Sequence, residues 1–145
     1  MGFFSYNCRG CGHPLLSGYA TNENNGWMNE VVAISPKGIV HKGTYDGYGR
    51  IDSLELGYPC KHDVWHEACY ELMDRPPYKG PAEDARDQGY FFDQKDHNVR
   101  RPKSKLAILK ARNKAKKAEE RMVKEDKRIQ AKWDRELAKK GATNA

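Results

Sequence analysis

Two short pairs of cysteine and histidine residues constrain the fold of this chain more than any other feature. The first pair is Cys8 and Cys11, and the second is His66 and Cys69. Within each pair, two intervening residues let one turn of backbone hold two ligands of a tetrahedral metal ion. Because structural zinc takes four such ligands, the two pairs together predict one zinc site that joins distant parts of the chain.

The four cysteines could instead form two disulfides. The chain opens on Met1–Tyr6 without the basic start and apolar run of a secretory signal. No stretch approaches the roughly 18 apolar residues that a membrane-spanning helix needs. We therefore expect an intracellular protein that is neither secreted nor membrane-bound. In that setting the C-x2-C spacing favours metal over disulfide.

Two glycine-containing turns after the first ligand pair indicate a small β-sheet. Pro36-Lys-Gly38 and Asp46-Gly-Tyr-Gly49 separate runs that contain β-branched residues. Short turns between such runs are typical of antiparallel hairpins. The sequence therefore predicts a three-stranded antiparallel meander, with strands at residues 30–35, 39–45 and 50–56.

The second ligand pair is predicted to lie on a helix. Asp63 is a suitable N-cap for a short helix over residues 64–73, which ends before two prolines. His66 and Cys69 would then share one face of its first turns. Residues 1–75 are thus predicted to form a small α+β head, and an ion would add stability that so small a core lacks.

Beyond residue 75 the composition changes twice. Residues 76–99 form a connector rich in Pro, Gly and Asp, and we expect its apolar knot, Tyr90-Phe91-Phe92, to dock on the head. Residues 103–140 contain no Gly or Pro and are dominated by Ala, Lys, Glu, Arg and Gln. These residue types favour helix, so residues 100–140 are predicted to form a long helical tail.

The positive charge of the chain is concentrated in this tail. Residues 100–140 hold 17 Lys or Arg against 6 Asp or Glu, a net charge of +11, whereas the whole chain carries +6. Residues 1–99 hold the other 9 Lys or Arg and 14 Asp or Glu and are therefore acidic. An acidic region followed by a basic one is typical of proteins that bind a polyanion. We therefore expect the tail to bind nucleic acid or a nucleoprotein assembly. The basic residues that open the tail are Arg100, Arg101, Lys103, Lys105, Lys110, Arg112, Lys114, Lys116 and Lys117.

A different interpretation gives the tail a protein partner. Apolar residues recur there every seven positions, at Ile108, Ala115, Met122 and Ile129. This is the spacing of a coiled-coil core, and such a stripe could dock on a partner helix. The protein would then be an adaptor that links other proteins.

The ligand pairs carry two resemblances to known zinc modules. The order of knuckle, hairpin and ligand-bearing helix resembles a treble clef. Residues 60–69, which contain Cys-x-His-x3-His-x2-Cys, resemble a RING-H2 finger when they are joined with the first C-x2-C pair. In that family the first, second, fifth and sixth ligands share one zinc, which implies Cys8, Cys11, His66 and Cys69. Cys60 and His62 would match ligands of a second zinc, but this chain has no later C-x2-C to complete it.

A further resemblance concerns the opening residues 1–8 and the stretch Tyr45–Arg50. Both are similar to segments of small uncharacterised proteins of bacteria and their phages. This likeness implies no function.

The predicted zinc site favours a structural role over catalysis. Four protein ligands leave no open position for the water that catalytic zinc requires. The sequence also lacks a P-loop, a dinucleotide fingerprint and a serine-nucleophile motif. We therefore expect a non-enzymatic protein with one structural zinc and no small-molecule substrate. A zinc-dependent nuclease is the third interpretation, with His41 as its catalytic histidine.

Overall fold

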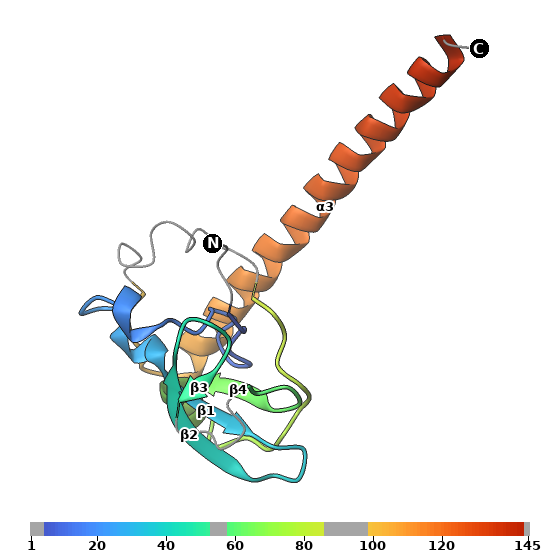
Figure 1. The fold of residues 1–145 in the computed structure, drawn as a ribbon. Coiled ribbons are helices and arrows are strands. Elements are labelled where there is room, and N and C mark those ends of the chain that lie inside the picture. The colour runs from blue at the N-terminus through green and yellow to red at the C-terminus, as the bar shows by residue number, and fades with distance from the viewer. Residues whose placement is uncertain (1–4, 53–57, 86–98, 144–145) are drawn as a thin grey trace. The chain divides into compact units, whose positions relative to one another are not determined.

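The computed structural model describes residues 5–52, 58–85 and 99–143 (Figure 1). The chain divides into two units, the N-terminal unit Met1–Arg112 and the C-terminal unit Asn113–Ala145. The fold is α+β with one long helix late in the chain, which confirms the predicted class. The end of the third predicted strand and the Tyr90-Phe91-Phe92 knot lie outside the described residues.

The described residues of the N-terminal unit contain one antiparallel sheet of four strands. These are β1 (Glu30–Ile34), β2 (Val40–Tyr45), β3 (Ile51–Asp52) and β4 (Asp63–His66). Their order across the sheet is β3-β2-β1-β4, so β1 and β2 lie inside and β3 and β4 form the edges (Figure 1). Two short 3-10 helices, Gly18–Ala20 and Gly26–Asn29, precede the sheet.

Strand β1 is the buried centre of the sheet. Its last four residues are all buried: Val31, Val32, Ala33 and Ile34. The strand is covered on both faces and therefore has a continuous apolar sequence instead of an alternating one. Ala33 lies opposite His41 of β2 on one side and opposite Val64 of β4 on the other.

The sheet has four strands where the sequence predicted three, and β4 replaces the predicted start of a helix. Asp63 does not cap a helix, because it begins a strand that pairs with β1. The physical reason is that β1 is buried along its second edge, where backbone N–H and C=O groups need hydrogen-bond partners. Val64 and Trp65 also suit a strand, since β-branched and aromatic residues are enriched there.

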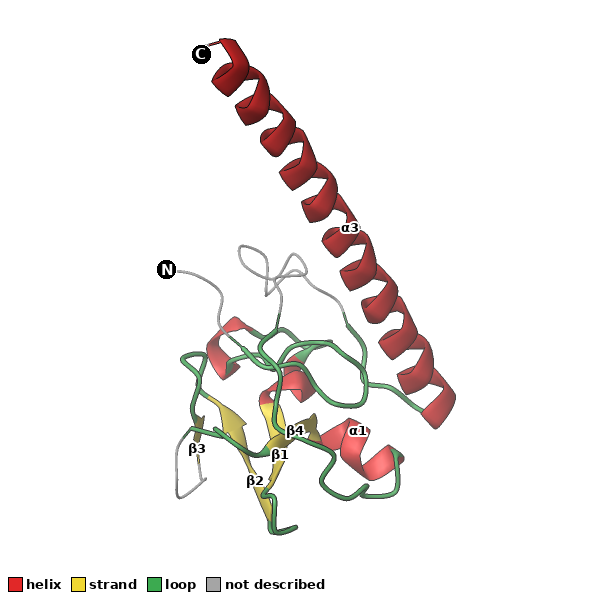
Figure 2. Ribbon diagram, turned by 90° about the vertical axis from the view of Figure 1, so that its right-hand side faces the viewer, coloured by secondary structure: helices red, strands yellow, loops and turns green. Residues whose placement is uncertain are grey.

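Helix α1 (Glu67–Leu72) is consequently shorter than predicted. His66 is its N-cap and has extended backbone angles. The helix ends where Asp74 and Arg75 adopt left-handed backbone angles, with φ values of 61° and 52°. Figure 2 shows α1 beside the sheet, and it packs against β1 and β4.

Each face of the sheet carries its own apolar cluster. Because side chains alternate along a strand, neighbouring residues point to opposite faces. One cluster contains Cys8, Cys11, Val32, Ile34, Trp65, Cys69, Tyr70 and Ile108. The cluster on the opposite face contains Leu15, Val31, Ala33, Tyr45, Ile51 and Val64. Three of the four predicted metal ligands therefore belong to the core of one face.

A buried ion pair ties the first cysteine turn to the sheet and to the chain after α1. Nε of Arg9 lies 2.8 Å from Oδ1 of Asp63, whose side chain is fully buried. The same guanidinium donates through Nη2 to the carbonyl oxygens of Gly80 and Pro81, at 3.1 and 2.9 Å. Charged groups are buried at low cost only when they are paired in this way. Arg9 thus joins the cysteine turn, β4 and the chain after α1.

Helix α3 (Lys105–Thr143) is the long helix that the composition predicted. The Ser104 hydroxyl accepts a hydrogen bond from the N–H of Ala107 at 3.2 Å, which is typical of a helix N-cap. The first turns of α3 belong to the N-terminal unit, where Ile108 is buried. The remainder forms the C-terminal unit.

Gly43→Ala is expected to destabilise the N-terminal unit. A Cβ at this position of β2 would lie 2.0 Å from the backbone oxygen of Asp52 and 2.9 Å from the side chain of Ile51. Because β3 would have to shift, we expect the free energy of unfolding to fall by about 1–3 kcal/mol in urea denaturation. Gly26→Ala is the control, since a Cβ there meets no atom within 4 Å. Equal losses in both variants would contradict this account.

Candidate metal centre

The first ligand pair lies in a tight turn at residues 8–12. The N–H of Gly12 donates to the carbonyl oxygen of Cys8 at 3.1 Å. Gly12 has a φ of 78°, a conformation that glycine adopts without a steric penalty. Gly10 is needed for a different reason, because a Cβ there would lie 2.8 Å from the ring of Trp65. The two glycines thus allow the turn to close against β4.

The second ligand pair lies where β4 passes into α1. His66 is the last residue of β4, and Cys69 lies in the first turn of α1. The N–H of His66 donates to Sγ of Cys8 at 3.2 Å. Hydrogen bonds of this kind favour the thiolate, which is the form of cysteine that binds metal. The backbone of the second pair therefore already contacts a sulfur of the first.

The structure brings together the four side chains that the sequence predicted as ligands. The ligand atoms of Cys8, Cys11, His66 and Cys69 all lie within 4.8 Å of one another, and all four residues are buried. Nδ1 of His66 is 3.3 Å from Sγ of Cys11 and 4.0 Å from Sγ of Cys69. A tetrahedral zinc with bonds of about 2.3 Å to sulfur and 2.0–2.1 Å to nitrogen separates its ligand atoms by about 3.5–3.8 Å. The four side chains could therefore hold one zinc ion.

Hydrogen bonding selects the nitrogen of His66 that faces the sulfurs. Nε2 lies 2.9 Å from the carbonyl oxygen of Pro14, and a carbonyl only accepts, so Nε2 carries the proton. Nδ1 is then left with its lone pair for a metal, and the bond to Pro14 fixes the orientation of the ring. Trp27 packs edge-on against this ring, with centroids 4.8 Å apart. Sequence spacing gave no signal for either Pro14 or Trp27.

The three thiols of the site compete for one negative charge. Burial acts to raise the pKa of Cys8, but hydrogen bonds with the thiols of Cys11 and Cys69 hold that pKa well below its ordinary value. Burial raises the pKa of Cys11 well above its ordinary value, and its hydrogen bonds to the other two thiols act in the same direction. The pKa of Cys69 is lowered by a hydrogen bond with Cys11, but the bond with Cys8 and burial outweigh this and raise it. A divalent cation would allow all three sulfurs to ionise.

Cys60 and His62 do not join this site. Cys60 is exposed, and the ring of His62 packs against His41 with centroids 5.7 Å apart. Among the described residues, the Cys8, Cys11, His66 and Cys69 group is the one cluster of three or more Cys, His or acidic side chains that could hold a metal. The RING-like second zinc site implied for Cys60 and His62 is therefore not formed there.

Comparison of the chain with protein families, curated proteins and solved structures gives no match. The treble-clef and RING-H2 resemblances therefore rest on the sequence motifs alone. Within the described ranges, none of the helices combines the length and apolar character that crossing a membrane requires.

Cys69→Ser is expected to abolish stoichiometric zinc binding and the cooperative unfolding of the N-terminal unit. Metal binding supplies part of the folding energy of a small zinc module. Loss of one ligand should therefore remove the zinc and, with it, the stability that the zinc provides. Elemental analysis and urea denaturation measure the two effects. Cys60→Ser is the matched control, because Cys60 is exposed. It should retain the zinc and change the free energy of unfolding by less than about 0.5 kcal/mol. Comparable damage from both variants would show that the ligands are wrongly assigned.

Zinc binding at pH 7 is expected to release about two to three protons per ion. In the folded unit the raised pKa values favour protonated Cys11 and Cys69 and the lowered pKa of Cys8 favours its thiolate, which gives two protons. A unit that folds only as the metal binds would release the proton of Cys8 as well. Protons compete with the metal, so the affinity should fall as the pH falls. Calorimetric titrations in buffers of different ionisation enthalpy count the protons. Binding without proton release would contradict coordination by the thiols.

Proposed function

We propose that this is a non-enzymatic zinc-binding protein whose basic segment binds nucleic acid. One observation supports the structural role of zinc. The four buried side chains that could hold an ion would fill a tetrahedral shell, which leaves no position for a reacting water. The ion would then stabilise the N-terminal unit, and binding would belong to the charged residues of the chain.

The observation that carries the nucleic-acid proposal is a cationic segment without acidic residues, residues 100–117. It contains nine Lys or Arg and no Asp or Glu, and all nine cationic residues are exposed. Lys105 pairs with Asp74. Among the described residues, no carboxylate forms an ion pair with any of the other eight. Unpaired exposed cations in a run are available to neutralise phosphates.

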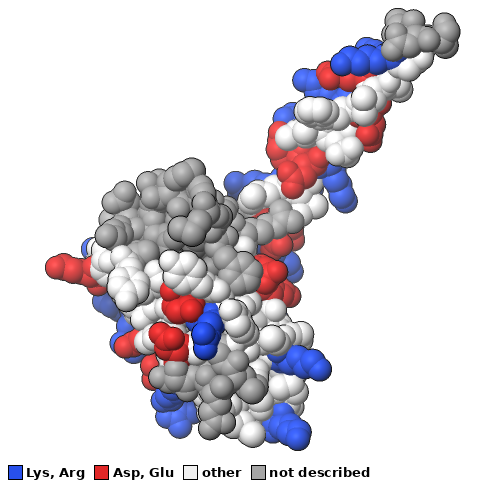
Figure 3. All heavy atoms as spheres, in the orientation of Figure 1, with Lys and Arg blue, Asp and Glu red and all other residues white. Residues whose placement is uncertain are grey.

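The later part of α3 differs in kind, although it also contains many cations. Residues 118–140 hold eight Lys or Arg against six Asp or Glu. Arg128 pairs with Glu125 at 2.5 Å. Figure 3 shows acidic and basic side chains intermingled along this stretch. The net charge is therefore low here, and phosphate binding is expected mainly from the cationic segment.

The arrangement of the cations favours contacts with the nucleic-acid backbone over reading of bases. On a helix of 3.6 residues per turn, Lys110 and Lys114 share one face, whereas Arg112 and Lys116 share the opposite face, so the cations are not gathered on one side. Phosphate contacts position a protein but carry no sequence information. We therefore propose strong, salt-sensitive binding without base preference, to RNA or to DNA.

A filter-binding salt titration of the full chain against RNA and duplex DNA tests this proposal. The test variant changes five cations of the cationic segment to glutamine: Lys110, Arg112, Lys114, Lys116 and Lys117. The matched control changes five later ones: Lys124, Lys127, Arg128, Lys132 and Arg135. Each phosphate contact contributes about 0.9 to the slope of log affinity against log salt, so the test variant should lose about 3–5 units of slope. The control should lose much less.

Two outcomes would count against the proposal. Equal losses of slope in both variants would show that binding depends on the total charge of the chain and not on the cationic segment. Absence of binding by the unmodified chain at low salt would discard the nucleic-acid role and favour the adaptor interpretation. Exposed apolar side chains on the later part of α3 would then be the surface to examine: Met122, Ile129, Trp133 and Leu137. Ile108, the first residue of the predicted stripe, is buried.

A further inference from the structure

His41 and His62 form a pair of imidazoles on one face of the sheet. His41 lies on β2 opposite Ala33, and His62 immediately precedes β4, in which Val64 also lies opposite Ala33. Because side chains alternate along strands, His41 and His62 share the face of Ala33. The cysteine cluster packs on the other face, with Trp65. The ring centroids of the two histidines are 5.7 Å apart, and the ring planes are inclined by 59°.

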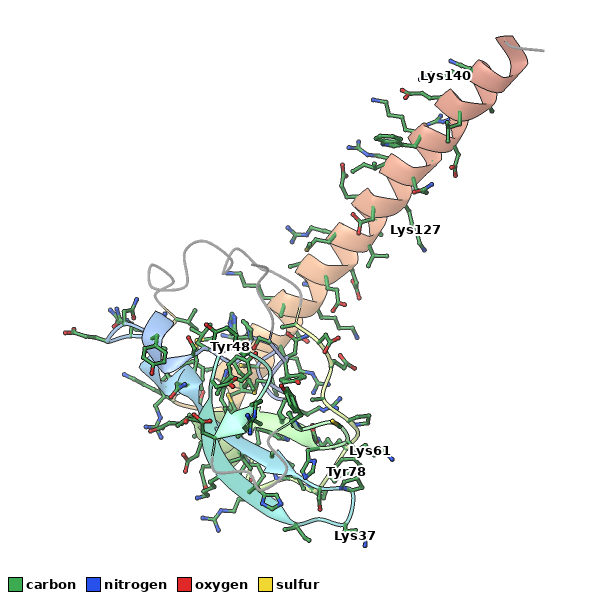
Figure 4. All side chains as sticks on the ribbon, in the orientation of Figure 1. Lys37, Tyr48, Lys61, Tyr78, Lys127 and Lys140 are labelled. Atoms are coloured by element: carbon green, nitrogen blue, oxygen red, sulfur yellow. The ribbon has the colours of Figure 1, made fainter. Side chains whose placement is uncertain are left out.

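The loop that carries His62 is held by hydrogen bonds on both sides. Lys61 and Tyr78 lie next to each other in Figure 4, and the Tyr78 hydroxyl donates to the carbonyl oxygen of Lys61 at 3.0 Å. The N–H of Ala82 donates to the carbonyl oxygen of His62 at 2.8 Å. The N–H of His62 donates to the carbonyl oxygen of Pro59 at 3.2 Å. The backbone that carries His62 therefore has a fixed position, which lowers the entropy cost of binding a ligand there.

The ring of His62 is buried but unsatisfied. The residue is 5% exposed, and neither Nδ1 nor Nε2 has a hydrogen-bond partner among the described residues. The neighbouring ring of His41 does not supply one either, since the two rings are in contact without a hydrogen bond. A buried polar group without a partner costs free energy, and native folds keep few of them. A ligand at this ring would supply the missing partner.

The separation of the two rings matches that of two imidazoles that bind one metal ion. A metal–nitrogen bond is about 2.0–2.1 Å long, and the ring centre lies about 1.1 Å beyond the nitrogen. At tetrahedral or trigonal angles, two imidazoles on one ion then have centroids about 5–6 Å apart. The observed 5.7 Å falls in this range.

We infer that His41 and His62 form a second metal site, which takes a divalent transition metal such as zinc, nickel or copper. Imidazole nitrogens suit these ions. Unlike the cysteine site, this one has an incomplete set of protein ligands, because two histidines would leave further coordination positions for water or a small anionic ligand. Burial, and next to it the electrostatic influence of His41, lowers the pKa of His62, which favours the neutral form of the ring that binds metal.

Zinc titration of the full chain that already carries one zinc tests this inference. Calorimetry should detect a second, weaker equivalent. In a proton–nitrogen correlation spectrum of the histidine side chains, the signals of His41 and His62 should shift together as it binds. H41Q and H62Q should each weaken the second equivalent by about tenfold or more, because each removes one of two protein ligands. Both variants should leave the first equivalent unchanged.

The controls separate this site from the cysteine site. H13Q removes an imidazole outside the pair and should retain the second equivalent. If H62Q fails to fold, the spectrum of the unmodified chain still decides the question. The inference is overturned if no second equivalent of zinc binds at concentrations up to millimolar. It is also overturned if the second equivalent still binds to both H41Q and H62Q, or if the signals of other histidines shift instead. The first equivalent of zinc reports on the cysteine site alone. Binding at each site can therefore be measured even if the other site binds no zinc.

Discussion

The crowding of three thiols and one imidazole into one buried space is the constraint around which the core on one face of the sheet is arranged. In the absence of a cation the sulfurs share one negative charge, and burial of charge is costly. A divalent ion would convert this unfavourable cluster into four bonds that join residues 8–11 to residues 66–69. The rest of one core is built around the same side chains, since Trp65, Tyr70 and Ile108 pack in the cysteine cluster.

The parts of this fold that could be predicted from sequence are those with a local signal. The spacing within each ligand pair, the glycine turns around β2 and the composition of α3 are all visible within short windows. β4 could not be predicted in this way, because Asp63–His66 reads locally as a helix start and its strand character comes from the buried edge of β1. The same holds for the partners of the site. Arg9 and the carbonyl group of Pro14 act on residues more than fifty positions away.

The possible zinc site and the exposed cations differ in their surroundings. The closed arrangement of the cysteine site suits a structural ion, whereas the cations of residues 100–117 are exposed and His62 has buried ring nitrogens without hydrogen-bond partners. The nucleic-acid role stays a prediction. It rests on the distribution of charge along the chain, which is already visible in the sequence. The histidine pair is different in kind, because His41 and His62 are brought together only by the register of the sheet.

X-ray absorption at the zinc edge, on the full chain loaded with one equivalent of zinc, tests the central claim most directly. The account predicts a first shell of three sulfurs at about 2.3 Å and one nitrogen at about 2.0–2.1 Å. A shell of nitrogen and oxygen alone would contradict it. So would a chain that binds no stoichiometric metal and is equally well folded without it.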